Sequence, residues 1–163
     1  MYVKLKKKYG QNFLIDENIA NKIVDLINFK KIKILEIGPG DGKLTNKIIS
    51  KNPKKLELIE IDKDLTQILK EKFKNNKLIN VINKNVLKHE INDNYDLVIS
   101  NLPYNISSQV LVKLSIMDNA PNEMILMFQK EFAAKLLENR LNSINSIVKC
   151  FFKIHLKFHV SKN

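Results

Sequence analysis

The feature that most constrains the fold is a regular alternation of short apolar runs with helical patterns. The runs have the length of β-strands and occupy residues 31–38, 55–62, 80–86, 96–101, 123–129 and 150–160. Helical periodicity fills most of the gaps, at residues 43–51, 64–74, 107–117 and 130–138. Strands that alternate with helices imply right-handed crossovers and a mainly parallel sheet covered on both faces. The sequence therefore predicts a doubly wound α/β domain whose ligand lies at the carboxyl ends of the strands.

The size and composition fit one globular domain. The 163 residues suffice for a single core, and the hydrophobic fraction of 44% with 28% charged residues is typical of a soluble protein. A further helix is predicted over 16–29, with Asp16 as its N-cap. No apolar run reaches the ~20 residues that cross a bilayer, and the basic amino terminus lacks the apolar stretch of a secretory signal. Cys150 stands alone in an apolar segment, so we expect a reducing, cytoplasmic location and a core role for this side chain.

The charge favours a polyanionic partner but does not identify one. The net charge is +11, yet 27 of the 28 basic residues are Lys and the chain also holds 21 Asn, which indicates a compositional bias. A solvated surface explains the total as well as a nucleic-acid footprint does. Clustering is more specific: Lys4, Lys6, Lys7 and Lys8 precede Tyr9 and form a basic arm that could reach a backbone phosphate.

Two of the predicted strand ends suggest a nucleoside site. Glycines at 38, 40 and 42 follow the first strand, where a ligand could lie against bare backbone, although a plain tight turn is the alternative. Lys43 stands where a dinucleotide-binding turn would have its third glycine, so a nucleoside without phosphates, such as S-adenosylmethionine, is favoured over a pyrophosphate. Glu60, at the end of the second strand, is predicted to accept hydrogen bonds from both ribose hydroxyls.

Neighbouring polar residues have competing interpretations. Asp64 with Gln67 three residues later is typical of a capping box at the start of a helix, while Asp62 could cap the helix or bind ribose. Asn85, at the third strand end, could meet the edge of an adenine through its amide. The turn-favouring character of Asn explains it about equally well.

The fourth strand ends in the tetrapeptide Asn101-Leu102-Pro103-Tyr104. Pro103 has no N–H and biases Leu102 to an extended conformation, so the turn can present the Asn101 amide oxygen and the Leu102 carbonyl outward. Two acceptors that hold the hydrogens of an adenine amine would localise its lone pair toward an incoming methyl group. Tyr104 would stack on the target base, whereas a turn with a buried Tyr is the alternative. A base must be unstacked for such chemistry, which favours loops or flipped nucleotides.

The ordered motifs "KKKYGQNFLID", "ILEIGPGDGKLT", "LIEIDKDL", "NLPYNIS" and "MFQKE" resemble the ribosomal RNA small-subunit adenine N6,N6-dimethyltransferase family (KsgA-type) from residue 6 to about 160. The resemblance implies the Rossmann-like class I S-adenosylmethionine-dependent methyltransferase fold. It also implies site residues. The cofactor would be bound by Asn12, Leu14, Gly38, Gly40, Glu60, Asn85 and Asn101, and the target amine and ring by Asn101, Leu102 and Tyr104.

The implied reaction is transfer of two methyl groups to each of two adjacent adenosines near the 3′ end of small-subunit rRNA. We expect a cytoplasmic monomer that acts on this rRNA or on the pre-ribosomal small subunit, without metal or membrane. The alternatives are a large-subunit rRNA adenine methyltransferase of the macrolide-resistance type and a non-catalytic ribosome-assembly or RNA-binding module. Labelled-methyl transfer would separate the enzymes from the module.

The sequence departs from the family pattern in several places. Asn85 replaces the usual aspartate, and Lys135 stands where the family has arginine. The link between "QKEFAAKLL" and "NSIVKCFF", residues 138–144, is several residues shorter than in the family. Family members continue past a strand like 153–160 into a last antiparallel strand and a small helical RNA-binding domain. We therefore expect one methyltransferase domain over 1–163, with the basic arm and cofactor-closing motif in 1–15, and without the last strand or the C-terminal domain.

Overall fold

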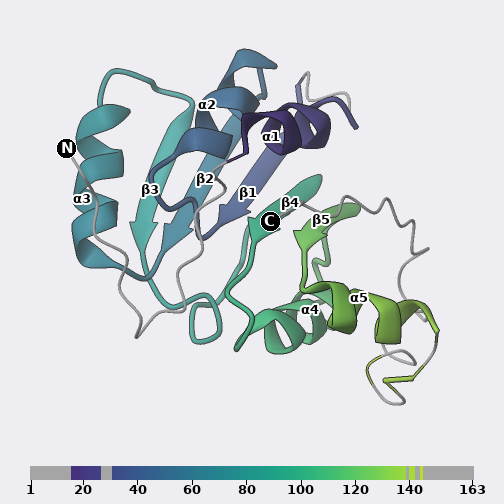
Figure 1. The fold of residues 1–163 in the computed structure, drawn as a ribbon. Helices are drawn as coiled ribbons and strands as arrows, with labels where there is room; N and C mark the ends of the chain where they lie inside the picture. The colour runs from purple at the N-terminus through teal and green to yellow at the C-terminus, as the bar shows by residue number, and fades with distance from the viewer. Residues whose placement is uncertain (1–15, 27–30, 139, 142–143, 145–163) are drawn as a thin grey trace.

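The computed structural model describes residues 16–26, 31–138, 140–141 and 144 (Figure 1). The described residues form five strands: β1 (Lys33–Ile37), β2 (Lys55–Glu60), β3 (Ile79–Asn83), β4 (Leu97–Asn101) and β5 (Glu123–Met127). They also form five helices: α1 (Glu17–Val24), α2 (Lys43–Ser50), α3 (Lys63–Lys72), α4 (Ser107–Ser115) and α5 (Lys130–Leu137).

The five strands make one parallel sheet in the order β3-β2-β1-β4-β5. The central strand β1 pairs with β2 on one side and with β4 on the other, so that Ile34 lies beside Leu56 and Leu97. The chain winds outward from β1 to β3, then crosses back to β4 and winds outward in the opposite direction. The strand order therefore reverses between β1 and β4, and a crevice is expected beyond the carboxyl ends of these strands.

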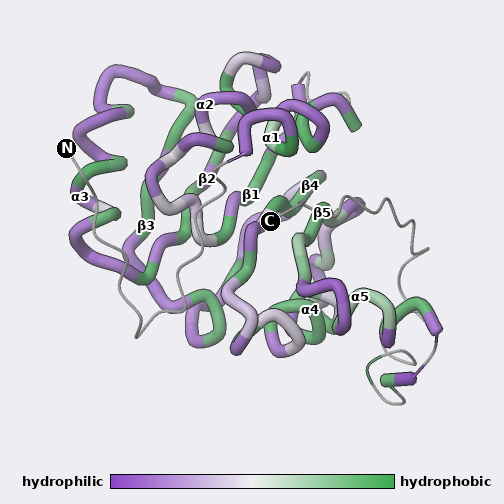
Figure 2. Tube along the Cα trace, in the orientation of Figure 1, coloured by the Kyte–Doolittle hydropathy of each residue, from purple (hydrophilic) through white to green (hydrophobic). Residues whose placement is uncertain are grey.

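Helices cover both faces of the sheet, as the doubly wound fold requires. One core cluster joins Ile34 of β1 and its neighbours to α1, α2 and α3, and includes Ile23 and Ile48. The second cluster, on the opposite face, joins Leu35 of β1 to Val110 of α4. Helix α5 packs beside α4, on the same side of the sheet (Figure 1). The strands carry mainly hydrophobic residues while the helices alternate in character (Figure 2), which places the core between these layers.

The predicted elements are confirmed wherever the structure describes them, with each described boundary within three residues of its expected place. The predicted strand 150–160 and the end of the helix 16–29 lie outside the described residues. Asp16 caps α1 as predicted, because its side chain accepts a hydrogen bond from the Asn18 N–H at 2.8 Å. The predicted capping box at Asp64 is wrong. Asp62 is the N-cap of α3 and accepts from the Asp64 N–H at 3.0 Å, so that Asp64 lies inside the first turn.

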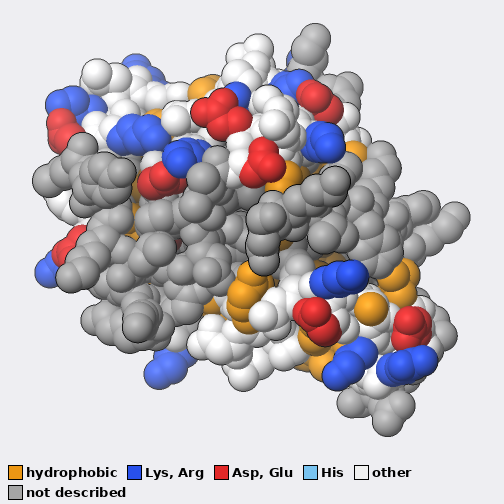
Figure 3. Space-filling model, viewed as in Figure 1, with side chains coloured by type: hydrophobic (Ala, Val, Ile, Leu, Met, Phe, Trp, Pro, Cys, Tyr) orange, Lys and Arg blue, Asp and Glu red, His pale blue; other side chains and the backbone are white. Residues whose placement is uncertain are grey.

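The face of the molecule seen in Figure 3 shows no separate patch of basic side chains among the described residues. On the face seen in Figure 3, Lys and Arg side chains of the described residues are interspersed with Asp and Glu. The predicted basic arm, Lys4, Lys6, Lys7 and Lys8, lies outside the described residues. In the part of the chain that the structure describes, no helix has the length and apolar character needed to cross a membrane.

Candidate nucleoside site and acceptor turn

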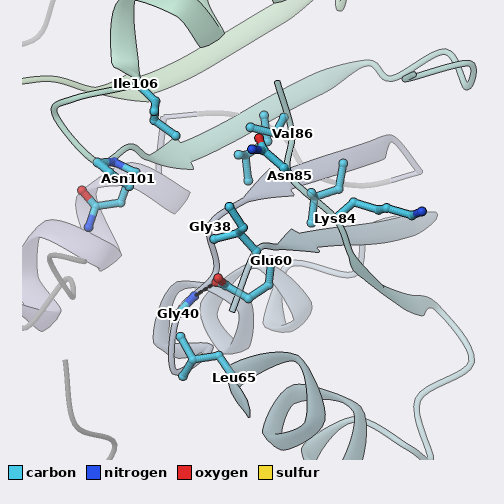
Figure 4. A pocket seen from close by; sticks show the side chains of 13 residues that line it. Gly38, Gly40, Glu60, Leu65, Lys84, Asn85, Val86, Asn101 and Ile106 are labelled. Carbon is cyan, nitrogen blue, oxygen red and sulfur yellow. Dashed lines mark hydrogen bonds between the residues drawn. The ribbon is translucent and has the colours of Figure 1, made fainter. Parts of the chain in front are cut away.

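A cavity opens at the carboxyl edge of the sheet, where the strand order reverses. The empty space that it encloses is about 580 Å³, which includes space open to solvent. The lining residues come from the ends of β1, β2, β3 and β4 and from the turns that follow them: Ile37, Gly38, Gly40, Ile59, Glu60, Ile61, Leu65, Lys84, Asn85, Val86, Asn101, Pro103 and Ile106. Five residues predicted from the sequence for the cofactor thus line one cavity (Figure 4).

The glycine turn after β1 serves two purposes. Gly38 and Gly40 line the cavity with φ angles of 67° and 61°, a left-handed conformation that glycine adopts without strain. A Cβ atom at Gly38 would find nothing within 4 Å, so this glycine borders open space. Gly42 does not line the cavity; a Cβ there would come within 3.0 Å of Leu69 and 3.3 Å of Phe73. The third glycine is therefore needed for packing against α3, whereas the first two leave room for a ligand.

Glu60 projects from the end of β2 toward the glycine turn. Its Oε2 accepts a hydrogen bond from the Gly40 N–H at 3.2 Å, and its Oε1 accepts from the Asp62 N–H at 2.9 Å (Figure 4). The side chain is only 4% exposed, and burial raises its pKa above the ordinary value for Glu, against the opposing effect of these two N–H donors. A carboxylate has about four acceptor positions, so two remain that could receive hydroxyl groups.

A second buried carboxyl, Glu36, lies near the glycine turn without lining the cavity. Its side chain is 1% exposed and its Oε2 accepts a hydrogen bond from the Thr45 hydroxyl at 2.8 Å. Burial raises the pKa of Glu36 from 4.5 to about 8, partly offset by Thr45, and the charge of Glu60 raises it further. Glu36 therefore carries a proton at neutral pH, and only Glu60 of this pair faces the cavity.

A network of hydrogen bonds that the sequence did not predict stabilises the turn that follows Glu60. The side-chain amide of Asn83, at the end of β3, donates to the Glu60 carbonyl at 2.9 Å and to the Ile61 carbonyl at 3.3 Å. The same nitrogen lies 3.0 Å from the Thr66 hydroxyl, which in turn donates to the Asp62 carbonyl at 2.8 Å. Asn83 is thus a positioning residue for the acidic turn. Because Asn is common in this chain, the sequence does not mark Asn83 as special. Its role becomes visible only when β3 is seen to pair with β2.

Asn85 lies across the cavity from the acceptor turn, beside Val86 (Figure 4). Its side-chain oxygen accepts a hydrogen bond from the Leu87 N–H at 2.9 Å, which closes a local turn. The interpretation of Asn85 as a turn residue is therefore confirmed, while its contact with an adenine edge stays a prediction that its position in the cavity lining allows.

The tetrapeptide after β4 forms a turn that leads into α4. Asn101 and Pro103 line the cavity, while the Leu102 side chain is buried in the core at 1% exposure. The Ile106 N–H donates to the Pro103 carbonyl at 3.1 Å, and the Ser107 hydroxyl donates to the Tyr104 carbonyl at 3.0 Å. Among the described residues no group donates to the Leu102 carbonyl. In Figure 4 the Asn101 amide points away from Asn85, toward the outer side of the cavity.

Tyr104 is 51% exposed, so the alternative of a buried Tyr is wrong. Its side chain does not line the cavity and stands outside it, next to the turn. Such a position leaves an aromatic face open to a large partner rather than to a small ligand inside the pocket.

Several cavity residues were not predicted from the sequence. Ile61 and Leu65 follow Glu60, Lys84 precedes Asn85, and Ile106 follows the acceptor turn. The position of Ile61 directly after the strand-ending acid was a usable signal, because an apolar side chain there must meet either solvent or a ligand. Two predicted cofactor residues, Asn12 and Leu14, lie outside the described residues. Within the described residues, no cluster of His, Cys, Asp and Glu is arranged to hold a metal ion.

Comparison with known proteins identifies the family. A sequence family described as ribosomal RNA adenine dimethylase matches residues 2–155. The chain belongs to the ribosomal RNA adenine dimethylase family. One relative, the ribosomal RNA small subunit methyltransferase A of Pelagibacter ubique, is 46% identical over 149 residues, which cover 88% of this chain. The match spans 56% of the length of that relative.

Solved structures agree with the family assignment. A dimethyladenosine transferase from Plasmodium falciparum superposes with a TM-score of 0.71 at 31% identity, over 77% of this chain and 46% of that one. The 23S rRNA methyltransferase ErmE superposes with a TM-score of 0.67 at 28% identity, over 76% of this chain and 50% of that one. The predicted Rossmann-like fold of class I S-adenosylmethionine-dependent methyltransferases is therefore confirmed.

Proposed function

We propose that this chain is an S-adenosylmethionine-dependent rRNA adenine N6,N6-dimethyltransferase that acts on small-subunit rRNA. The observation that carries the proposal is a single cavity with two unlike ends. One end has the glycine turn and Glu60, which suit a nucleoside, and the other has Asn101 at the turn that leads from β4 to α4. The membership of the rRNA adenine dimethylase family supports this assignment, as does the name of the small-subunit relative.

The cavity fits the proposed cofactor. Gly38 borders open space that a side chain would fill, and Glu60 keeps acceptor positions for the two ribose hydroxyls. Ile61, Leu65 and Val86 supply the apolar wall that a purine ring needs. When bound, S-adenosylmethionine supplies an electrophilic methyl group. The protein contributes a buried acceptor for the ribose and excludes water from the base.

The acceptor turn orients the target amine. Asn101 lines the cavity, and in this proposal its side-chain oxygen and the Leu102 carbonyl would accept the two hydrogens of an exocyclic amine and so direct the nitrogen lone pair toward the methyl donor. The buried Leu102 side chain anchors this turn in the core, which suits an acceptor that must be in place before reaction. The exposed ring of Tyr104 offers a stacking face for an unpaired adenine.

An assay of methyl transfer tests this function directly. Small ribosomal subunits from cells that lack the modification would be incubated with labelled S-adenosylmethionine and either the wild type or Asn101→Ala, and methyl incorporation would be measured. We expect transfer by the variant to fall about 100-fold or more, as when one preorganised polar contact to a reacting group is removed. Binding of S-adenosylhomocysteine, measured by calorimetry, should weaken only modestly. Asn105→Ala is the matched control, because Asn105 is an exposed asparagine in the same turn that does not line the cavity.

Three outcomes would contradict parts of the proposal. Undiminished transfer by Asn101→Ala would remove the role given to the acceptor turn. Methyl groups mapped to large-subunit RNA would replace the substrate with that of the macrolide-resistance type. Binding of ribosomal subunits without any methyl incorporation by the wild type would indicate a non-catalytic module.

A further inference from the structure

We propose that Asn85 weakens the preference of the nucleoside site for a 6-amino purine over a 6-oxo purine. This inference rests on the proposed function, because it assumes that the cavity holds the nucleoside part of the cofactor. It concerns base specificity, which neither the family membership nor the cavity shape determines.

The orientation of the Asn85 amide is set by the chain itself. The Leu87 N–H donates to Oδ1 at 2.9 Å, and the Asn85 main-chain carbonyl accepts from the Lys88 and His89 N–H groups at 3.0 and 2.9 Å. A flipped amide would place its NH2 group against the Leu87 N–H donor, so this turn disfavours the flip. The oxygen is therefore committed to the turn, and the NH2 group is the polar group that remains for the cavity.

The two kinds of purine place opposite demands on that position. A 6-amino group donates hydrogen bonds and needs an acceptor, whereas a 6-oxo group needs a donor. An aspartate in this turn would have two acceptor oxygens, one for the Leu87 N–H and one for the amine, and it would repel a 6-oxo group. The Asn85 NH2 group offers a donor instead. It can meet either the 6-oxo group or the N1 acceptor of adenine.

The other side chains that line the cavity are less suited than Asn85 to contact the 6-substituent of the purine. The side chains of Ile61, Leu65 and Val86 that line the same part of the cavity are apolar and cannot distinguish the two substituents. Glu60 is already bonded to the N–H groups of Gly40 and Asp62 at the glycine turn. In Figure 4 the Lys84 ammonium points away from Asn85, and Asn101 lies across the cavity. Among the described polar side chains that line the cavity, Asn85 is thus the one that we assign to the purine edge.

The test compares two ligands and three proteins by calorimetry. The ligands are S-adenosylhomocysteine and its 6-oxo analogue, S-inosylhomocysteine, and the proteins are the full chain, Asn85→Asp and Asn76→Asp. Asn76 is the matched control, because its Oδ1 accepts from the Leu78 N–H at 3.0 Å in the same kind of turn, away from the cavity. The Asn76→Asp substitution adds the same negative charge at a position that does not face the ligand.

We expect the ratio of the two dissociation constants, 6-oxo over 6-amino, to rise about tenfold in Asn85→Asp, the change produced by one ordinary hydrogen bond. The ratio for Asn76→Asp should equal that of the wild type. An unchanged or lower ratio would overturn the inference alone. Failure of the wild type to bind either ligand would overturn the proposed function with it.

Discussion

The two ends of the same sheet use their polar side chains in opposite ways. At the amino ends of the strands, a group that we call the lower network (Lys33, Lys55, Glu57, Asn80, Asp93 and Tyr95) is joined internally by hydrogen bonds and ion pairs. At the carboxyl ends, Glu60, Asn85 and Asn101 face a cavity. The comparison shows that polar residues at a strand end do not by themselves indicate a site; what matters is whether they also border open space.

The lower network is saturated with internal partners. The Tyr95 hydroxyl and the Asn80 amide both donate to the Glu57 carboxylate. Lys33 and Lys55 each lie 3.2 Å from Asp93, and their hydrogen bonds lower the pKa of that carboxyl. These contacts fasten the segment before β4 to the starts of β1 and β2. The carboxyl edge instead keeps a buried acid whose pKa is raised, a combination that is common at functional sites.

The largest expected effect comes from Glu36→Gln, which should stabilise the protein at high pH. The folded protein retains a proton on Glu36 up to about pH 8, whereas the unfolded chain releases it near pH 4.5. The free energy of unfolding of the wild type therefore falls as pH rises between these values. The neutral amide removes this penalty, so we expect the variant to be more stable by roughly 2 to 4 kcal/mol at pH 9 and unchanged at pH 4.

Urea unfolding at the two pH values measures this difference. Glu90→Gln is the control, because Glu90 is exposed and its neutralisation should leave the pH dependence unchanged. Equal stability of Glu36→Gln and the wild type at pH 9 would show that burial of the Glu36 carboxylate does not destabilise the folded protein.

The next effect is on cofactor affinity through Glu60→Gln. Replacing the carboxylate weakens the acceptor for the ribose hydroxyls, so the dissociation constant of S-adenosylhomocysteine should rise about 10-fold to 100-fold at pH 8. Because burial raises the pKa of Glu60, the wild type should lose affinity with falling pH earlier than an ordinary Glu would allow, while the variant should not. Calorimetric titrations across the pH range record both results. A pH-dependent loss that persists in the variant would assign the titration to another group.

The smallest effect is expected from Tyr95→Phe in the lower network. The change removes one hydrogen bond to Glu57, which keeps its contact with Asn80, so the free energy of unfolding should fall by about 1 kcal/mol. Affinity for S-adenosylhomocysteine should stay the same, since Tyr95 lies at the opposite end of the strands. Denaturant unfolding and calorimetry on the same preparation test this separation. A weakened ligand affinity of Tyr95→Phe would show that the lower network and the cavity are not independent.

The sequence predicts the strands and helices well because their apolar spacing is a local property. Gly38, Glu60, Asn85 and Asn101 could be predicted together because each lies at the end of a strand or within two residues after it, and parallel strands end at one edge. The role of Gly42 could not be predicted, since it depends on how closely α3 approaches the turn. The choice of Asp62 over Asp64 as helix cap depends on the residue at which β2 ends. The network around Asn83 requires the neighbour relation of β2 and β3, which local patterns do not contain.

The contacts of Asn83 with the Glu60 turn have one practical consequence for protein engineering. The loop that would bind the sugar and the loop that would bind the base are joined by the side-chain amide of Asn83 and by the Lys84 N–H, which donates to the Glu60 carbonyl at 3.1 Å, so altering one loop shifts the other. A designer who wishes to transplant this half of the pocket onto another scaffold would have to move both loops as a pair.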